Sequence, residues 1–95
     1  MADRVQEDGV RLLRAVEEEH SERREGQPLQ ANTPVVPEAA AQRIGLSPDH
    51  ERYEAAVRWL EEQNAIEGDE RAGDVGGKRM YLITPRGIEM LGEGA

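Results

Sequence analysis

The most regular hydrophobic pattern of the chain lies between residues 48 and 63. Apolar side chains recur there at the spacing i, i+3, i+4 and i+7, and they are Tyr53, Ala56, Val57 and Leu60. Side chains with this spacing share one face of an α-helix. Ser47 and Pro48 suit the N-cap and the first turn of such a helix. The pattern therefore predicts a helix over residues 48–63 that packs this stripe against the core.

Two more helices are predicted before this one. Residues 3–25 carry apolar residues at helical spacing, but Gly9 disfavours helix by about 1 kcal/mol relative to alanine, so we expect the ordered part to begin later. Residues 37–44 predict a short helix that starts at a proline and ends before Gly45. A three-residue turn then leads into the helix over residues 48–63, which is a helix-turn-helix arrangement.

Short β-strands are predicted on both sides of the helix-turn-helix. Val35 and Val36 form a β-branched pair that suits a sheet edge, and residues 64–67 predict a second strand. Residues 78–84 alternate between two faces, as a third strand does. The glycine-rich segment between the last two strands offers a reversal at residues 74–77, so these strands predict a β-hairpin.

A last helix is predicted after the hairpin, in a chain whose composition fits one domain. Thr84 and Pro85 repeat the pattern of a cap followed by a proline. The chain has 95 residues, 37% of them hydrophobic, which suffices for one modest core over about residues 5–92. The whole order of helices and strands predicts an α+β fold in a single domain over residues 1–95.

Composition also excludes several kinds of site. There is no cysteine, which excludes disulfides, thiol nucleophiles and cysteine-ligated zinc. No stretch approaches the roughly 18 apolar residues of a membrane span, and the N-terminus has no signal-peptide pattern. We therefore expect a cytoplasmic protein that does not associate with a membrane.

Three segments of the chain resemble bacterial winged helix-turn-helix regulators. Residues 41–47 read AQRIGLS and are similar to the segment that runs from the second helix of these proteins into the following turn. Residues 56–67 read AVRWLEEQNAIE and resemble the recognition helix running into the first wing strand. Residues 81–91 read YLITPRGIEML and resemble the last wing strand and its following helix. Asn64 stands where the family often has glycine, and asparagine tolerates the same left-handed backbone.

This resemblance covers residues 38–92 and implies both a fold and a function. The implied fold is a winged helix-turn-helix, with a three-helix core, a β-hairpin wing and a short C-terminal helix. The implied function is binding of double-stranded DNA in prokaryotic transcriptional regulation, with the helix over residues 48–63 in the major groove and the wing on the phosphate backbone. By the same analogy a homodimer is expected, for which residues 3–25 are the candidate contact.

Five basic side chains are the candidate DNA contacts. Arg58 lies on the outer face of the helix over residues 48–63 and Arg52 on its flank, and arginine is the commonest reader of guanine. Arg71, Lys78 and Arg79 flank the glycine-rich tip of the wing, where they can contact phosphates. Each group has an alternative role. Charged side chains on a helix surface are often solvated and bind no ligand. Basic residues on edge strands also prevent pairing with other chains.

The net charge of −8 opposes binding to nucleic acid. Much of the negative charge lies in residues 17–25, so DNA binding remains compatible with it if that end of the first helix points away from the duplex. The acidic total, together with Glu51 and Glu62 on the helix over residues 48–63, favours a rival function. In this alternative the chain is an acidic winged-helix module that binds a protein and no nucleic acid.

Little in the sequence indicates catalysis. His20 and His50 lie in different elements without ligand-like neighbours, and the glycine-rich residues 73–78 join strands instead of opening a helix as a phosphate loop does. We therefore expect no enzymatic activity, no cofactor and no metal site. Trp59 lies off the centre of the hydrophobic stripe, so we expect it to pack beneath the wing, or alternatively to contact a partner protein.

Overall fold

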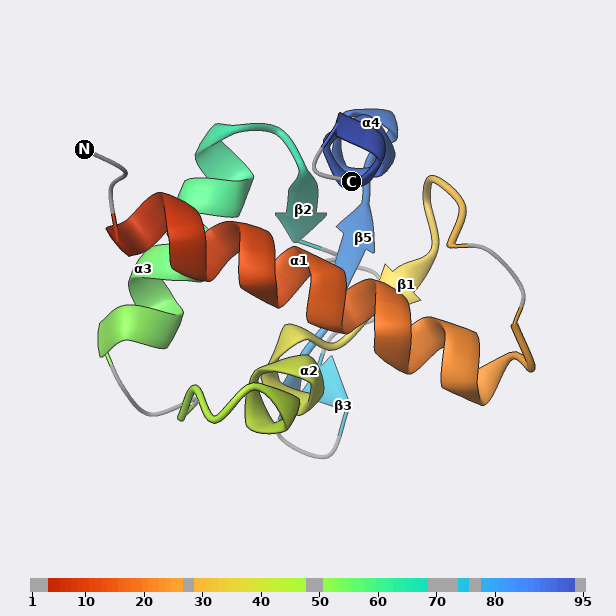
Figure 1. Cartoon of the computed structure of the whole chain (residues 1–95), viewed down its shortest axis with the longest axis horizontal. Coiled ribbons are helices and arrows are strands. Elements are labelled where there is room, and N and C mark those ends of the chain that lie inside the picture. Colours follow the sequence, from red (N-terminus) through yellow and green to blue (C-terminus); the bar gives the residue numbers. More distant parts are fainter. Residues whose placement is uncertain (1–3, 27–28, 48–50, 69–73, 76–77, 94–95) are drawn as a thin grey trace.

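The computed structural model describes residues 4–26, 29–47, 51–68, 74–75 and 78–93, with only the backbone described at 74–75, 78–79 and 93. Within these residues the fold is α+β, with four helices and a three-stranded antiparallel sheet (Figure 1). This confirms the predicted α+β class. In chain order the elements are α1 (Arg4–Arg23), β1 (Pro34–Val35), α2 (Pro37–Arg43), α3 (Glu51–Glu62), β2 (Ile66–Gly68), β3 (Asp74–Val75), β4 (Lys78–Arg79), β5 (Tyr81–Ile83) and α4 (Pro85–Glu93).

Strand β5 is the centre of the three-stranded sheet, whose order is β1-β5-β2. On one side of β5, Val35 pairs with Tyr81, and on the other side Ile66 pairs with Ile83. Both pairings are antiparallel. The central strand therefore joins the segment that precedes α2 to the segment that follows α3. The predicted pairing of the strands in residues 64–67 and 78–84 is present between β2 and β5.

The strand boundaries differ from the predicted ones by a residue or two. β1 ends at Val35 because Val36 is the N-cap of α2, with φ −118° and ψ 95°. β2 begins only at Ile66 because the backbone turns at Asn64, where φ is 60°. The expected strand over residues 78–84 is split at Met80 into β4 and β5, and β4 pairs with β3 in a separate two-stranded ribbon.

Helix α1 crosses the whole molecule and packs on α2, α3 and α4 (Figure 1). It is helical from Arg4 through Gly9, so the expected late start was wrong. Gly9 is buried against the indole ring of Trp59, and a Cβ at this position would lie 2.9 Å from the ring atom Cζ3. The close packing of α1 on α3 thus explains the glycine. It also places Trp59 against α1, where we had expected it beneath the wing.

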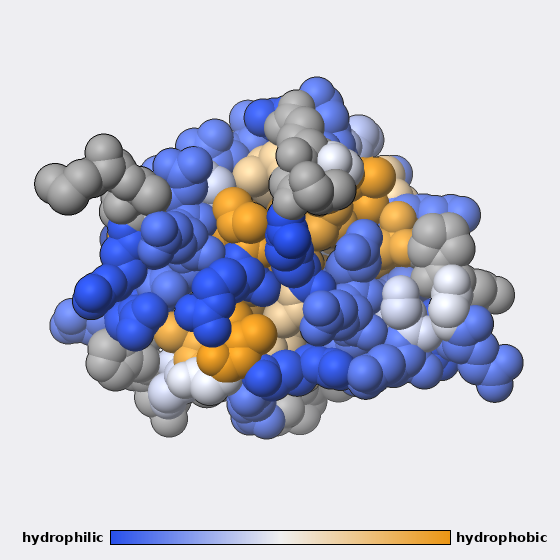
Figure 2. Space-filling model, in the orientation of Figure 1, coloured by the Kyte–Doolittle hydropathy of each residue, from blue (hydrophilic) through white to orange (hydrophobic). Residues whose placement is uncertain are grey.

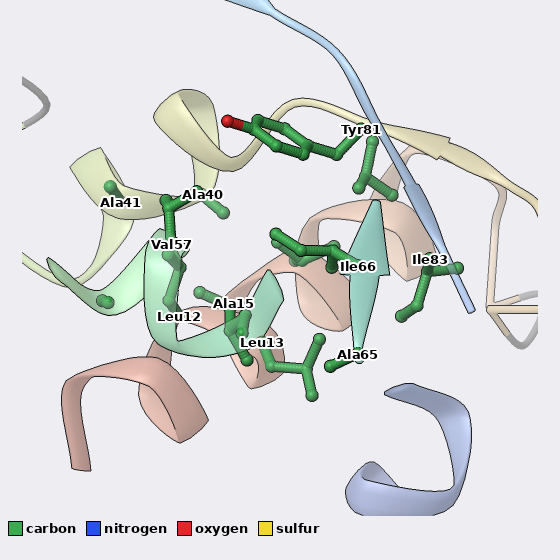
Figure 3. Close-up of a cluster of buried hydrophobic side chains, with 14 of the residues drawn as sticks. Leu12, Leu13, Ala15, Ala40, Ala41, Val57, Ala65, Ile66, Tyr81 and Ile83 are labelled. Atoms are coloured by element: carbon green, nitrogen blue, oxygen red, sulfur yellow. The ribbon is translucent and has the colours of Figure 1, made fainter. Parts of the chain in front are cut away.

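The hydrophobic core lies between α1, α3 and the sheet. Leu12 and Leu13 of α1 are fully buried, as are Leu60 of α3 and Ile83 of β5. Figure 3 shows the side chains of α1 meeting those of β2 and β5. All four members of the predicted stripe in α3 are buried, which confirms that this face of the helix packs inward.

Helix α4 begins at the predicted cap. The hydroxyl oxygen of Thr84 accepts a hydrogen bond from the backbone N–H of Gly87 at 3.1 Å, and the same hydroxyl donates to the carbonyl of Asn64. Gly87 is buried where α4 meets the junction of α3 and β2. A Cβ on Gly87 would lie 2.9 Å from Cγ1 of Ile83 and well inside contact with the carbonyl oxygen of Ala65. This approach of two backbones requires glycine.

The turns around α3 adopt the expected left-handed backbone. Gly45 has φ 72° after α2, and Asn64 has φ 60° after α3. The predicted start of the third helix at Pro48 lies outside the described residues, in which α3 begins at Glu51. In the part of the chain that the structure describes, no helix combines the length and the apolar character that crossing a bilayer requires.

Candidate interaction surface

The side chain of Arg52, one of the two candidate DNA contacts on α3, is directed toward α1. Its Nε and Nη2 atoms donate hydrogen bonds to the carboxylate of Asp8, at 3.1 and 2.8 Å. The side chain of Asp8 is only 4% exposed, and Arg11 adds a second cation 3.9 Å from it. The hydrogen bonds from Arg52 hold the pKa of Asp8 below its ordinary value, although burial of the carboxylate acts in the opposite direction. Arg52 thus joins α3 to α1.

The other arginine, Arg58, is exposed on the outer side of α3. It borders a groove of about 450 Å³ between α2, α3 and β5, which we call the α3 groove and which is lined by Glu38, Tyr53, Glu54, Val57, Arg58, Glu61 and Tyr81. The lining of the groove therefore carries three carboxylates and one guanidinium. Among the described residues Arg58 makes no ion pair, not even with the carboxylate four residues before it.

The floor of the α3 groove is aromatic. Tyr53 is 7% exposed and belongs to the core cluster, yet its side chain also lines the groove. Its burial, and secondarily the nearby charge of Glu38, raise the pKa of the Tyr53 hydroxyl above its ordinary value. Tyr81 reaches from β5 toward α2, with its hydroxyl at the leading end (Figure 3). The groove thus combines two phenol rings with a rim of carboxylates.

The wing residues among the candidate DNA contacts are less fully placed. Lys78 and Arg79 form β4, whose backbone pairs with β3 and lies beside α2. Their side chains, and all of Arg71, lie outside what the structure describes. The DNA contacts of these three residues therefore stay predictions.

The acidic end of α1 lies on the opposite side of the molecule from the first turns of α3 (Figure 1). Part of its charge is neutralised locally. Glu22 accepts two hydrogen bonds from the guanidinium of Arg43 in α2, at 2.6 and 2.7 Å, and Glu19 pairs with Arg23 at 3.3 Å. A net charge of −8 is compatible with DNA binding if the acidic end of α1 points away from the duplex. The arrangement of α1 and α3 is compatible with this condition.

The outer face of α1, the candidate for a homodimer contact, is mostly hydrophilic, and its apolar areas are separated by polar side chains (Figure 2). Its exposed positions between residues 4 and 22 are polar or charged, and they are Arg4, Gln6, Glu7, Arg11, Arg14, Glu18 and Glu22. Such a face gives a homodimer little apolar area to bury. The homodimer therefore stays a prediction without structural support.

Two features of this surface were missed in the sequence. The sequence did indicate the ion pair of Asp8, because a carboxylate at this position interrupts the apolar spacing of α1 between Val5 and Leu12. A charge on a buried face usually has a partner. The α3 groove had no such signal, because Glu38 and Tyr81 come from other elements than α3 and meet it only in the folded chain. As for metals, the described residues contain no cluster of three histidine or acidic side chains that could hold an ion.

Comparisons with known proteins return nothing for this chain: no protein-family model, no curated protein and no solved structure matches it.

Proposed function

We propose that the chain is a winged helix-turn-helix domain that binds another protein through the exposed face of α3. The order of the elements supports this fold, as does the strand order β1-β5-β2, in which the strand before the helix pair joins the hairpin that follows it. The left-handed glycine turn at Gly45 between α2 and α3 supports it as well. Because one fold serves many functions, the partner has to be argued from the surface.

The charge on α3 is the observation that carries the choice of a protein partner. The exposed acidic residues of this helix are Glu51, Glu54, Glu61 and Glu62. Against them stand Arg58 and Arg52, and Arg52 is engaged by Asp8. Neutralisation of phosphates by lysine and arginine supplies most of the affinity of proteins for DNA, so a helix with this balance repels a duplex. A partly apolar floor with a polar rim suits a protein interface instead.

DNA binding in transcriptional regulation is the second candidate function. It is favoured by the exposure of Arg58 and by the position of Lys78 and Arg79 on the β3–β4 ribbon, where a wing contacts the phosphate backbone. In this candidate the wing supplies most of the affinity, with Arg71 beside it, and α3 enters the major groove.

Two binding experiments on the full chain distinguish these functions. The first follows the fluorescence anisotropy of a labelled mixed-sequence duplex at about 50 and 200 mM salt, a range over which phosphate contacts weaken strongly. The second selects peptides from a random library on the immobilised chain and maps the enriched peptides by backbone amide shifts. We expect no duplex binding at either salt concentration, and enriched peptides that shift amides of α2, α3 and β5.

The opposite results would support DNA binding, the second candidate function. Duplex binding that falls steeply with salt, and that is lost in Arg58→Ala and Arg79→Ala but kept in the control Arg14→Ala on α1, supports the second candidate. A library from which no peptide maps to the α3 face contradicts the protein-binding proposal.

A further inference from the structure

We propose that the α3 groove recognises a positively charged side chain, arginine or lysine, presented by the partner protein. The inference rests on the proposed protein-binding function and names the chemistry of its partner.

The charge of the groove is the first argument. Glu38 lies on α2, while Glu54 and Glu61 lie on either side of Arg58 in the sequence of α3, so three carboxylates and one guanidinium line the groove and leave two negative charges in excess. Among the described residues none of the three carboxylates forms an ion pair or a side-chain hydrogen bond. Elsewhere the same chain pairs exposed carboxylates closely, as Glu22 does with Arg43 at 2.6 Å. Negative charge that is left unpaired at one groove is complementary to a cation on a partner.

The hydroxyl of Tyr53 is the second and independent argument. Although the residue is only 7% exposed, this hydroxyl has no hydrogen-bond partner within the described part of the chain. No side-chain polar atom there is both enclosed and unsatisfied, so the hydroxyl retains some access to solvent, and the groove is a cavity that Tyr53 lines. A largely buried ring with an unpartnered hydroxyl thus offers an acceptor in the same groove that the carboxylate of Glu38 lines. An ammonium or guanidinium group donates hydrogen bonds and accepts none, so it can satisfy both oxygens together.

The apolar surface of the groove favours a cationic side chain over a free cation as its ligand. The largely buried side chains of Tyr53, Val57 and Tyr81 contribute apolar surface to the groove beside the carboxylates. The long methylene stem of arginine or lysine packs on apolar surface while its charged head stays at the polar rim. The aromatic faces add a favourable interaction with the cation. A groove of about 450 Å³ accommodates such a side chain with part of the neighbouring peptide.

The test titrates the labelled full chain with a short glycine-serine peptide carrying one central arginine, and with the same peptide carrying citrulline. Citrulline keeps the shape of arginine and removes its charge. We expect the arginine peptide to shift amides of α2, α3 and β5, with binding that weakens as salt rises from about 50 to 500 mM. We expect the citrulline peptide to bind about tenfold more weakly, because it loses the ionic contacts with the rim.

Variants locate the binding site. Tyr53→Phe removes the free hydroxyl and keeps the buried ring, so we expect the fold to be retained and the affinity for the arginine peptide to fall about threefold. The double variant Glu38→Gln and Glu61→Gln should abolish binding. The control, Glu7→Gln with Glu18→Gln on the exposed face of α1, changes net charge equally and should leave the affinity unchanged.

Each contrary result has a distinct meaning. Equal binding of the citrulline peptide, or an equal loss in the α1 control, refutes a cation-specific groove. If uncharged peptides from the library shift the same amides more strongly than the arginine peptide does, the protein-binding function survives and the cationic partner is refuted. If only duplex DNA shifts α3, both proposals fall.

Discussion

Replacement of Gly87 by alanine tests the packing of α4 most directly. Gly87 follows the cap of α4 and lies against the backbone at the junction of α3 and β2. An added Cβ would meet the carbonyl oxygen of Ala65 well inside van der Waals contact. That same oxygen accepts the backbone N–H of Thr84 at 3.0 Å. The oxygen cannot move aside as a flexible side chain would, so α4 has to shift away from the core.

The size of the effect follows from two opposing terms. Forcing extra volume into a packed site costs about 1–3 kcal/mol. Alanine favours a helix interior over glycine by about 1 kcal/mol. Because the clash is with backbone, we take the upper part of the first range, and the expected net loss for Gly87→Ala is about 1–2 kcal/mol. In a domain of this size that loss lowers Tm by roughly 4–16 °C.

Gly92→Ala in the same helix is the matched control, because nothing lies within 4 Å of a Cβ at this position. It gains helix propensity without a clash, so we expect a stability equal to wild type or up to about 1 kcal/mol higher. Urea unfolding, followed by Trp59 fluorescence and by far-ultraviolet circular dichroism, gives both values. If Gly87→Ala is as stable as Gly92→Ala, the close approach of α4 to Ala65 is refuted.

Two further predictions concern α1. Because Arg52 depresses the pKa of Asp8, the stability from this pair is full above the ordinary pKa of 3.8 and is lost as pH falls through the lower, folded value. Asp8→Asn should thus cost about 1–3 kcal/mol in urea unfolding at pH 7 and much less near pH 2, and an unchanged cost at both would contradict the linkage. Gly9→Ala should destabilise wild type but stabilise a Trp59→Ala background by about 1 kcal/mol, as a double-mutant cycle measures; equal effects in both would exclude the contact.

The features that the sequence predicts well are those set by near neighbours. The stripe from Tyr53 to Leu60 needs only helical spacing, and the cap at Thr84 needs only the three residues that follow it. The left-handed backbone at Gly45 and Asn64 follows from the conformational freedom of those residue types. Such local preferences do not depend on where the rest of the chain lies.

The features that escape prediction join distant segments. Asp8 and Arg52 stand 44 residues apart, and the role of Arg52 changes once that contact is known. From the sequence alone Gly9 predicts a weakened helix, whereas the structure shows that the ring of Trp59 occupies the space that a Cβ would need. The α3 groove depends in the same way on bringing Glu38 of α2 to α3, which no spacing along the chain encodes.

The central position of β5 has a consequence for the order in which this chain acquires structure. Strands β1 and β2 each pair with β5 and not with one another, so neither has its hydrogen-bonded neighbour until residues 81–83 have been synthesised. A nascent chain that ends before that point leaves the edges of β1 and β2 unpaired and open to other chains. Completion of the sheet therefore depends on residues 81–83, whose contacts with β1 have a long sequence separation.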